Sequence, residues 1–288
     1  ELRALEKQGV FELRSRRIFM DALTLQTAQQ AGEANGGSQV LLSYIVNRIT
    51  RGDGLTPYSI VTAISDPPAI SNDIPHPISR PIKPGEIVIT DWLQGDLANE
   101  TNATIGLRYF ILGDSREMGE ADATATYAGN VSLAKFQNKG IDREMMPAFP
   151  GIKKIRDLGD LGKLGFDVDA KLINEHPTAD EYWDEYRGTP KAFISLEYGQ
   201  SLWKNPYGKA TAVRYPFIIG GKEKIESAFH DHFLPASIGL IFSPVREEAL
   251  ASSRAATPFG VLFLGLSFFL VAAALILMAL LFVFGVEQ

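Results

Sequence analysis

Residues 259–286 read FGVLFLGLSFFLVAAALILMALLFVFGV, a run of 28 residues without a charged side chain, and this run decides the architecture of the chain. An α-helix rises 1.5 Å per residue, so about 20 apolar residues cross the roughly 30 Å of hydrocarbon in a bilayer. The preceding Thr257 and Pro258 are typical of an N-cap and of a first helical position. Helices in the core of soluble proteins are rarely apolar on every face over such a length. The sequence therefore predicts one transmembrane helix, over residues 257–286.

The residues before this helix have the composition of a water-soluble domain. All 28 Lys and Arg and 33 of the 34 Asp and Glu precede the apolar run, so this part carries a formal charge of −5. Phosphate binding needs clustered Lys and Arg, and the short group of Arg14, Arg16 and Arg17 is too small to supply it. We therefore expect a soluble domain over residues 1–250, with no nucleic acid as its partner.

Both ends of the chain are unusual. The sequence begins at Glu1 with neither an initiator Met nor a signal peptide, and it stops at Gln288 directly after the apolar run. We expect it to be a fragment of a longer protein.

The chain contains no cysteine, which excludes disulfides, thiolate metal ligands and a cysteine nucleophile.

The segment between the domain and the apolar run predicts the orientation in the membrane. Residues 245–254 contain Arg246, Glu247, Glu248 and Arg254, so they carry no cationic excess. Cytoplasmic flanks of transmembrane helices are usually enriched in Lys and Arg. We therefore predict that residues 1–250 lie outside the cytoplasm.

Hydrophobic periodicity and turn residues predict a mixed α+β fold for the soluble part. The first nine residues read as the end of a polar helix that stops at Gly9. The predicted strands cover residues 11–19, 39–49, 59–64, 86–89, 104–112, 121–133, 191–196, 209–216 and 238–244. The predicted helices cover residues 21–34, 90–97, 197–204 and 223–233.

These elements suggest two subdomains. A small β module falls within residues 1–135, and a strand–helix–strand unit over 209–244 falls within a second part, about residues 180–250. A strand–helix–strand unit packs its helix on one face of a sheet. Residues 66–85 are rich in Pro and predict a surface loop, and residues 138–180 have no clear periodicity.

Histidines and glycines of this chain do not fall into metal-binding or phosphate-binding patterns. His230 and His232 would lie about 200° apart on a helix, so they cannot chelate one ion. The stretches at Gly220–Lys222 and Gly162–Lys163 lack the GxxxxGK[ST] spacing of a phosphate-binding loop. GxSxG and HExxH motifs are also missing.

One group of acids deserves comparison with a sugar site. Asp180, Glu181, Asp184 and Glu185 are interleaved with aromatic residues, and a pair of carboxylates beside aromatic rings is typical of glycoside hydrolases. The acids are also i, i+4 neighbours on a short amphipathic helix, whose aromatic side chains Tyr182, Trp183 and Tyr186 would face the core. We favour the second interpretation. The sequence thus predicts no catalytic, cofactor-binding or metal-binding residues, no cofactor and no enzymatic activity, including ATP hydrolysis.

Two stretches resemble a known family. Residues 252–288, above all FGVLFLGLSFFL (259–270) and FGVEQ (284–288), resemble the second membrane helix of FtsX-like (MacB/LolC-type) ABC-transporter permeases. KPGEIVITDWL (83–93) is similar to the strand-then-helix element of their extracytoplasmic domain. The unit over 209–244 resembles the porter-like part of the same domains.

This resemblance implies a function and a set of partners. It implies a permease subunit of the inner membrane, with a MacB-like periplasmic domain, that transmits the ATP-driven motion of a separate ABC ATPase for export or lipoprotein release. The expected partners are that ATPase, the lipid bilayer and a second permease protomer or homodimer. A single-span receptor or sensor with an extracytoplasmic ligand-binding domain is the alternative, and a membrane-tethered enzyme is a third possibility.

Overall fold

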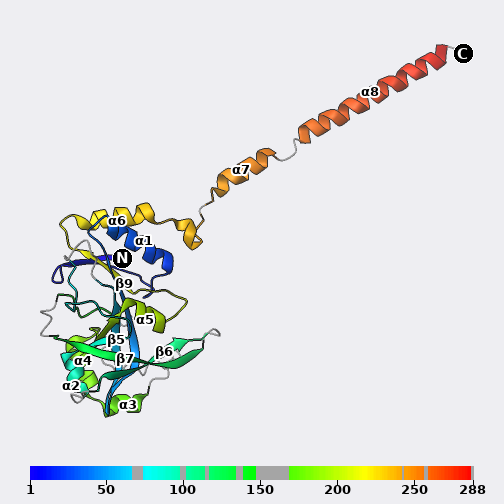
Figure 1. Ribbon diagram of the computed structural model, residues 1–288. Coiled ribbons are helices and arrows are strands. Elements are labelled where there is room, and N and C mark those ends of the chain that lie inside the picture. Colours follow the sequence, from blue (N-terminus) through cyan, green and yellow to red (C-terminus); the bar gives the residue numbers. More distant parts are fainter. Residues whose placement is uncertain are drawn as a thin grey trace. The chain divides into compact units, whose positions relative to one another are not determined.

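The computed structural model describes two compact units, unit 1 (Glu1–Ile238) and unit 2 (Gly239–Gln288) (Figure 1). The residues described are 1–66, 74–97, 102–113, 117–133, 139–146, 169–241, 243–255 and 259–286. The strands are β1 (Leu2–Leu5), β2 (Val10–Arg14), β3 (Gln39–Arg51), β4 (Gly54–Ile64), β5 (Glu86–Thr90), β6 (Thr104–Leu112), β7 (Met118–Val131), β8 (Ala192–Ser195) and β9 (Ala212–Pro216). The helices are α1 (Ala22–Glu33), α2 (Asp91–Asp96), α3 (Ala170–Glu175), α4 (Thr178–Tyr186), α5 (Leu196–Leu202), α6 (Gly221–His232), a 3-10 turn (Pro235–Ile238), α7 (Val245–Ala255) and α8 (Phe259–Val286).

Six of the strands close into a barrel-like sheet. The order of the whole sheet is β1-β2-β9-β3-β4-β8-β5-β7-β6, and β6 also pairs with β3. This extra pairing joins β6 back to β3, so β3, β4, β8, β5, β7 and β6 form a ring without a free edge. The sequence prediction of a mixed fold followed by one apolar C-terminal helix is therefore confirmed.

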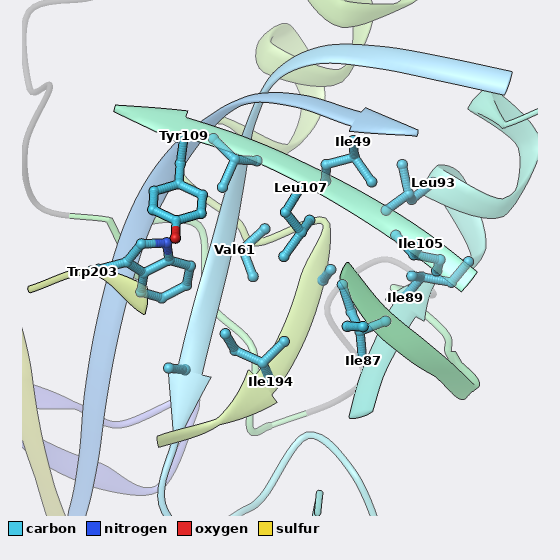
Figure 2. Close-up of a cluster of buried hydrophobic side chains, with 14 of the residues drawn as sticks. Ile49, Val61, Ile87, Ile89, Leu93, Ile105, Leu107, Tyr109, Ile194 and Trp203 are labelled. Atoms are coloured by element: carbon cyan, nitrogen blue, oxygen red, sulfur yellow. The ribbon is translucent and has the colours of Figure 1, made fainter. Parts of the chain in front are cut away.

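The barrel is filled with apolar side chains (Figure 2). Branched residues such as Val61, Ile87 and Ile194 occupy its centre and are fully buried. Leu93, at the start of α2, and Trp203, directly after α5, lie at opposite ends of the cluster in Figure 2. The side chains that fill a small barrel make it a core rather than a channel.

The strand β3 continues beyond the barrel and carries a second part of the sheet. Its first residues, Gln39–Leu41, pair with β9, while Val46–Thr50 pair with β6. The three strands β9, β2 and β1 therefore extend from one side of the barrel as an arm. The helices α1 and α6 cover one face of this arm, because Leu25, Ala28 and Ile225 pack in one cluster with the side chains of β2 and β9.

Local sequence signals predicted several elements correctly. Asp21 caps α1, and its Oδ1 accepts hydrogen bonds from the amides of Leu23 and Thr24 at 3.1 and 2.9 Å. Thr90 ends β5 and caps α2, with its Oγ1 accepting from the amide of Leu93 at 3.2 Å. Both helices begin within one residue of the starts predicted for them, residues 21 and 90.

The N-terminal prediction was wrong. Instead of a polar helix that stops at Gly9, residues Leu2–Leu5 form β1, which pairs antiparallel with β2. The expected strand over residues 11–19 also ends earlier, at Arg14, because the chain turns at residues 15–18. The pairing of β2 with both β1 and β9 overrides the local helix preference of Leu, Arg, Ala and Glu.

Two C-terminal predictions also need correction. Residues 238–244 were expected to form a strand. The described residues of this range form none, and Ile238 is the last residue of a 3-10 turn. Because β9 already pairs with β2 on one side and β3 on the other, it offers no edge to a returning strand. The range 138–180 is not wholly irregular, since α3 and the start of α4 lie in it.

Candidate functional site

The helix α8 is the one described helix that is long and apolar enough to cross a membrane. It runs for 28 residues and has no buried residue. Its expected cap at Thr257 and Pro258 lies outside the described residues. The 11-residue helix α7 precedes it within unit 2. A helix that is apolar on all sides and has no protein packed against it is suited to a lipid environment.

The acids around Tyr182 belong to an amphipathic helix, as the favoured interpretation predicted. Tyr182, Trp183 and Tyr186 are buried on α4, whereas Glu181 and its acidic neighbours Asp184 and Glu185 are exposed. The ring of Trp92 lies 5.6 Å from that of Tyr182 and 5.5 Å from that of Tyr186, both edge to face. Rings packed into the core in this way are not accessible to a sugar.

The two neighbouring histidines lie on the exposed surface of α6. His230 and His232 are both exposed, and Nδ1 of His232 lies 2.7 Å from the carbonyl oxygen of Ala228. Within the described residues, His, Asp and Glu form no group of three or more that could hold a metal ion. Gly220 ends the turn before α6 with a φ of 71°, while Gly162 and Lys163 lie outside the described ranges.

A buried cluster of charged side chains holds the arm of the sheet together. Arg3 on β1, Glu12 on β2 and Arg214 on β9 are opposite one another across the three strands. Glu12 Oε2 accepts from Nε of Arg214 at 2.8 Å, and its Oε1 accepts from Nη2 of Arg3 at 3.0 Å. Arg14 binds the same carboxylate, and Asp142 binds Arg214. We call these five residues the Glu12 cluster.

The electrostatics of the Glu12 cluster favour the ionised carboxylate. Both Glu12 and Arg214 have a side-chain exposure of 0%. Burial alone would raise the pKa of the Glu12 carboxyl, but the charges of Arg214, Arg14 and Arg3 outweigh it and lower this pKa to about 2. The cluster therefore stays charged at neutral pH, and it joins strands separated by 202 residues in sequence.

A second buried ion pair lies beside the barrel. Lys191 Nζ donates to Oδ2 of Asp96 at 2.8 Å and to Oγ1 of Thr56 at 3.1 Å. The same ammonium group lies 4.7 Å from the centre of the Tyr182 ring. Burial lowers the pKa of Lys191, and the charge of Asp96 opposes this effect. The pair connects β4, α2 and the residue before β8.

Two small pockets open on the described surface of unit 1. One of about 240 Å³ is lined by Arg3, Arg14 and Arg16, where the first two guanidinium groups already bind Glu12. Another of about 100 Å³ is lined by the apolar side chains of Leu42 and Trp203 and by polar residues that include Gln200 and Lys204. Sites for drug-sized ligands usually measure about 300–1,000 Å³. Both of these pockets are smaller than that range.

Sequence reasoning missed both buried ion pairs, although a signal was present. Glu12 is flanked by Val10, Phe11 and Leu13, and Arg214 stands between Val213 and Tyr215. A charged residue within an apolar strand usually needs a buried partner of opposite sign. That rule indicates that partners exist, but it does not tell which acid meets which base.

No known family model matches this chain, and no curated protein matches it.

Proposed function

We propose that this chain is a piece of an ABC-transporter permease subunit, in which α8 crosses the inner membrane and unit 1 lies outside the cytoplasm. In this proposal a separate ATPase moves α8, and the motion reaches unit 1 to drive export or lipoprotein release. A second permease protomer completes the membrane part.

The observation that carries this proposal is the character of α8. It has 28 residues without a charged side chain and no buried face, and its sequence resembles the second membrane helix of FtsX-like permeases. The resemblance of residues 83–93 adds support. These residues form β5 and the capped start of α2, which is the strand-then-helix order that the resemblance implies.

Unit 1 is suited to transmitting or receiving motion as a solid body. Its barrel has no free strand edge, its interior is filled, and the Glu12 cluster connects the arm to the segment around Asp142. A packed core of this kind is not continuously deformable, so a displacement applied at one point moves the whole unit.

We predict that the permease acts together with ATPase activity that this chain itself lacks. The chain purified alone in detergent should neither bind nor hydrolyse ATP, since it has no phosphate-binding loop. The full-length protein purified from its native membranes should instead bring an ATPase with it. Saturable ATP binding by the chain alone would contradict this expectation. Native membranes that yield the full-length protein without ATPase activity would favour the receptor or sensor alternative.

We also predict the orientation of unit 1. In the full-length protein, an enzyme that is active only in the cytoplasm should be silent when it is inserted after Ala251 with α8 retained, while one that is active only outside should work there, because residues 245–254 have no cationic excess. The matched control places both reporters at the other end of α8, after Val286, where the activities should be reversed. Cytoplasmic activity at Ala251 would refute the proposed topology.

A further inference from the structure

Three consecutive apolar side chains of unit 1 are exposed in the turn between β9 and α6. Phe217 is 37% exposed, Ile218 is 49% exposed and Ile219 is 95% exposed. Elsewhere in the described part of unit 1, large exposed apolar side chains do not follow one another in sequence. Exposed apolar groups that lie together usually mark a contact site.

The protein core holds this turn in place. The ring of Phe217 stacks on that of Phe11, with centroids 4.8 Å apart, and its amide donates to the carbonyl of Gly9 at 3.1 Å. The amide of Gly221 donates to the carbonyl of Ile218 at 2.8 Å. Gly220 adopts a φ of 71°, a conformation that most other residues avoid. The turn therefore presents its two isoleucines outward from a fixed base.

The turn lies at one end of α6, and the chain leaves unit 1 beyond the other end of that helix. The turn directly precedes α6, and the last residues of unit 1, Pro235–Ile238, come directly after that helix. Between Ile238 and Phe259 there are 20 residues, 11 of which form α7. The helical part spans about 16 Å and the others at most about 30 Å, so the tether from Ile238 to α8 is at most roughly 50 Å long. The 12-residue α6, about 18 Å long, separates the turn from the residues that lead into this tether.

We propose that the 217–219 turn contacts lipid, with Ile218 and Ile219 entering the interfacial region of the bilayer that α8 spans. This inference rests on the membrane-anchoring part of the proposed function, but it holds equally for a permease and for a receptor. Because the tether to α8 keeps unit 1 within reach of the bilayer, the turn meets lipid at a raised effective concentration, and a few apolar side chains are enough for contact.

The size and charge of the turn favour lipid over a protein partner. A stable protein interface buries about 800 Å² on each partner, which is far more than three side chains supply. The first turns of α6 carry Lys222, Glu223, Lys224 and Glu226, so charge is nearly balanced there. The contact should therefore depend on apolar insertion and not on anionic lipid.

The absence of cysteine from the chain allows a direct test. The full chain with Ile219→Cys carries an environment-sensitive fluorophore and is placed in phosphatidylcholine vesicles that contain nitroxide-labelled lipid. The matched control is Lys171→Cys on α3, where the side chain is 85% exposed. Figure 1 places α3 and α6 at opposite ends of unit 1. We expect lipid quenching at position 219 to exceed that at position 171 roughly twofold or more. Adding Ile218→Ser should reduce the quenching at 219.

Each result decides the question. Equal quenching at 219 and 171 overturns the inference, and so does quenching at 219 that Ile218→Ser leaves unchanged, since the fluorophore alone then enters the lipid. Protection of position 219 from aqueous iodide without lipid quenching indicates a protein contact and also overturns it. Vesicle flotation separates the proposed membrane anchoring by α8 from the proposed lipid contact of the 217–219 turn. A chain that does not float refutes the anchoring together with this inference, whereas a chain that floats with equal quenching refutes this inference alone.

Discussion

Replacing Glu12 by Gln should lower the free energy of unfolding of unit 1 by about 3–5 kcal/mol, the usual cost of removing one partner from a buried ion pair. The carboxylate of Glu12 has no exposed surface and binds Arg214, Arg3 and Arg14. A neutral amide cannot compensate these charges, so the fully buried guanidinium of Arg214 would keep only Asp142 as its acidic partner. The large effect comes from the uncompensated charge more than from the lost hydrogen bond.

Glu144→Gln is the matched control, because it is the same chemical change on another ligand of Arg3. Oε2 of Glu144 accepts from Nη1 of Arg3 at 2.7 Å, but the side chain of Glu144 is 68% exposed. Exposed ion pairs contribute about 0–1 kcal/mol. Urea unfolding of the full chain in detergent can be followed by tryptophan fluorescence, since Trp92, Trp183 and Trp203 all belong to unit 1. Similar losses for the two variants would refute the role given to burial.

The effect of Glu12→Gln should also depend on pH. The pKa of Glu12 is lowered to about 2 in the folded protein, from an ordinary value near 4.5. A group with a lowered folded pKa stabilises the protein above its unfolded pKa, and this contribution disappears as the pH falls through the folded value. The difference in stability between wild type and variant should therefore shrink by roughly 3 kcal/mol between pH 5 and pH 2. A difference that stays constant over this window would show that Glu12 acts by packing alone.

The parts of the fold that were predicted from sequence are those with local causes. Asp21 and Thr90 determine where α1 and α2 begin through hydrogen bonds within three residues, and the apolar run of α8 needs no partner to be recognised. The amphipathic pattern of α4 likewise placed its aromatic residues correctly.

The parts that were missed depend on distant partners. The barrel closes because β6 pairs with β3, and β1 is a strand because β2 lies beside it, although its residues alone favour a helix. The strand predicted over residues 11–19 did not by itself indicate that the face carrying Glu12 is buried. That face is covered by residues around Gly140 and Asp142, which bind Arg214. The apolar neighbours of Glu12 indicate that it has a buried partner, but no local pattern in the sequence identifies the segment that covers it.

A flexible insertion before α8 should reduce transport steeply without unfolding the protein. Ten Gly and Ser residues placed after Ser252 interrupt α7, the helix that connects unit 1 to α8 within the chain. A helix carries displacement along its axis, whereas a Gly/Ser segment behaves as a random coil and absorbs it as entropy. Under the proposed permease function, motion of α8 would no longer reach unit 1. Transport, scored as rescue of cells that lack the native gene, should fall steeply, while the ATPase activity of the partner continues.

The control inserts the same ten residues after Lys7, in the exposed turn between β1 and β2. Enlarging that loop costs only about 1 kcal/mol of closure entropy, and the turn does not lie between unit 1 and α8. Transport should therefore survive this insertion. Membrane flotation and tryptophan fluorescence establish that both variants are inserted and folded. If the insertion after Ser252 leaves transport unchanged, α7 is a passive tether and force does not pass through it. If transport and ATPase activity fail together, the insertion has disturbed assembly with the ATPase, and the proposed separation between ATP hydrolysis and the motion of unit 1 is wrong.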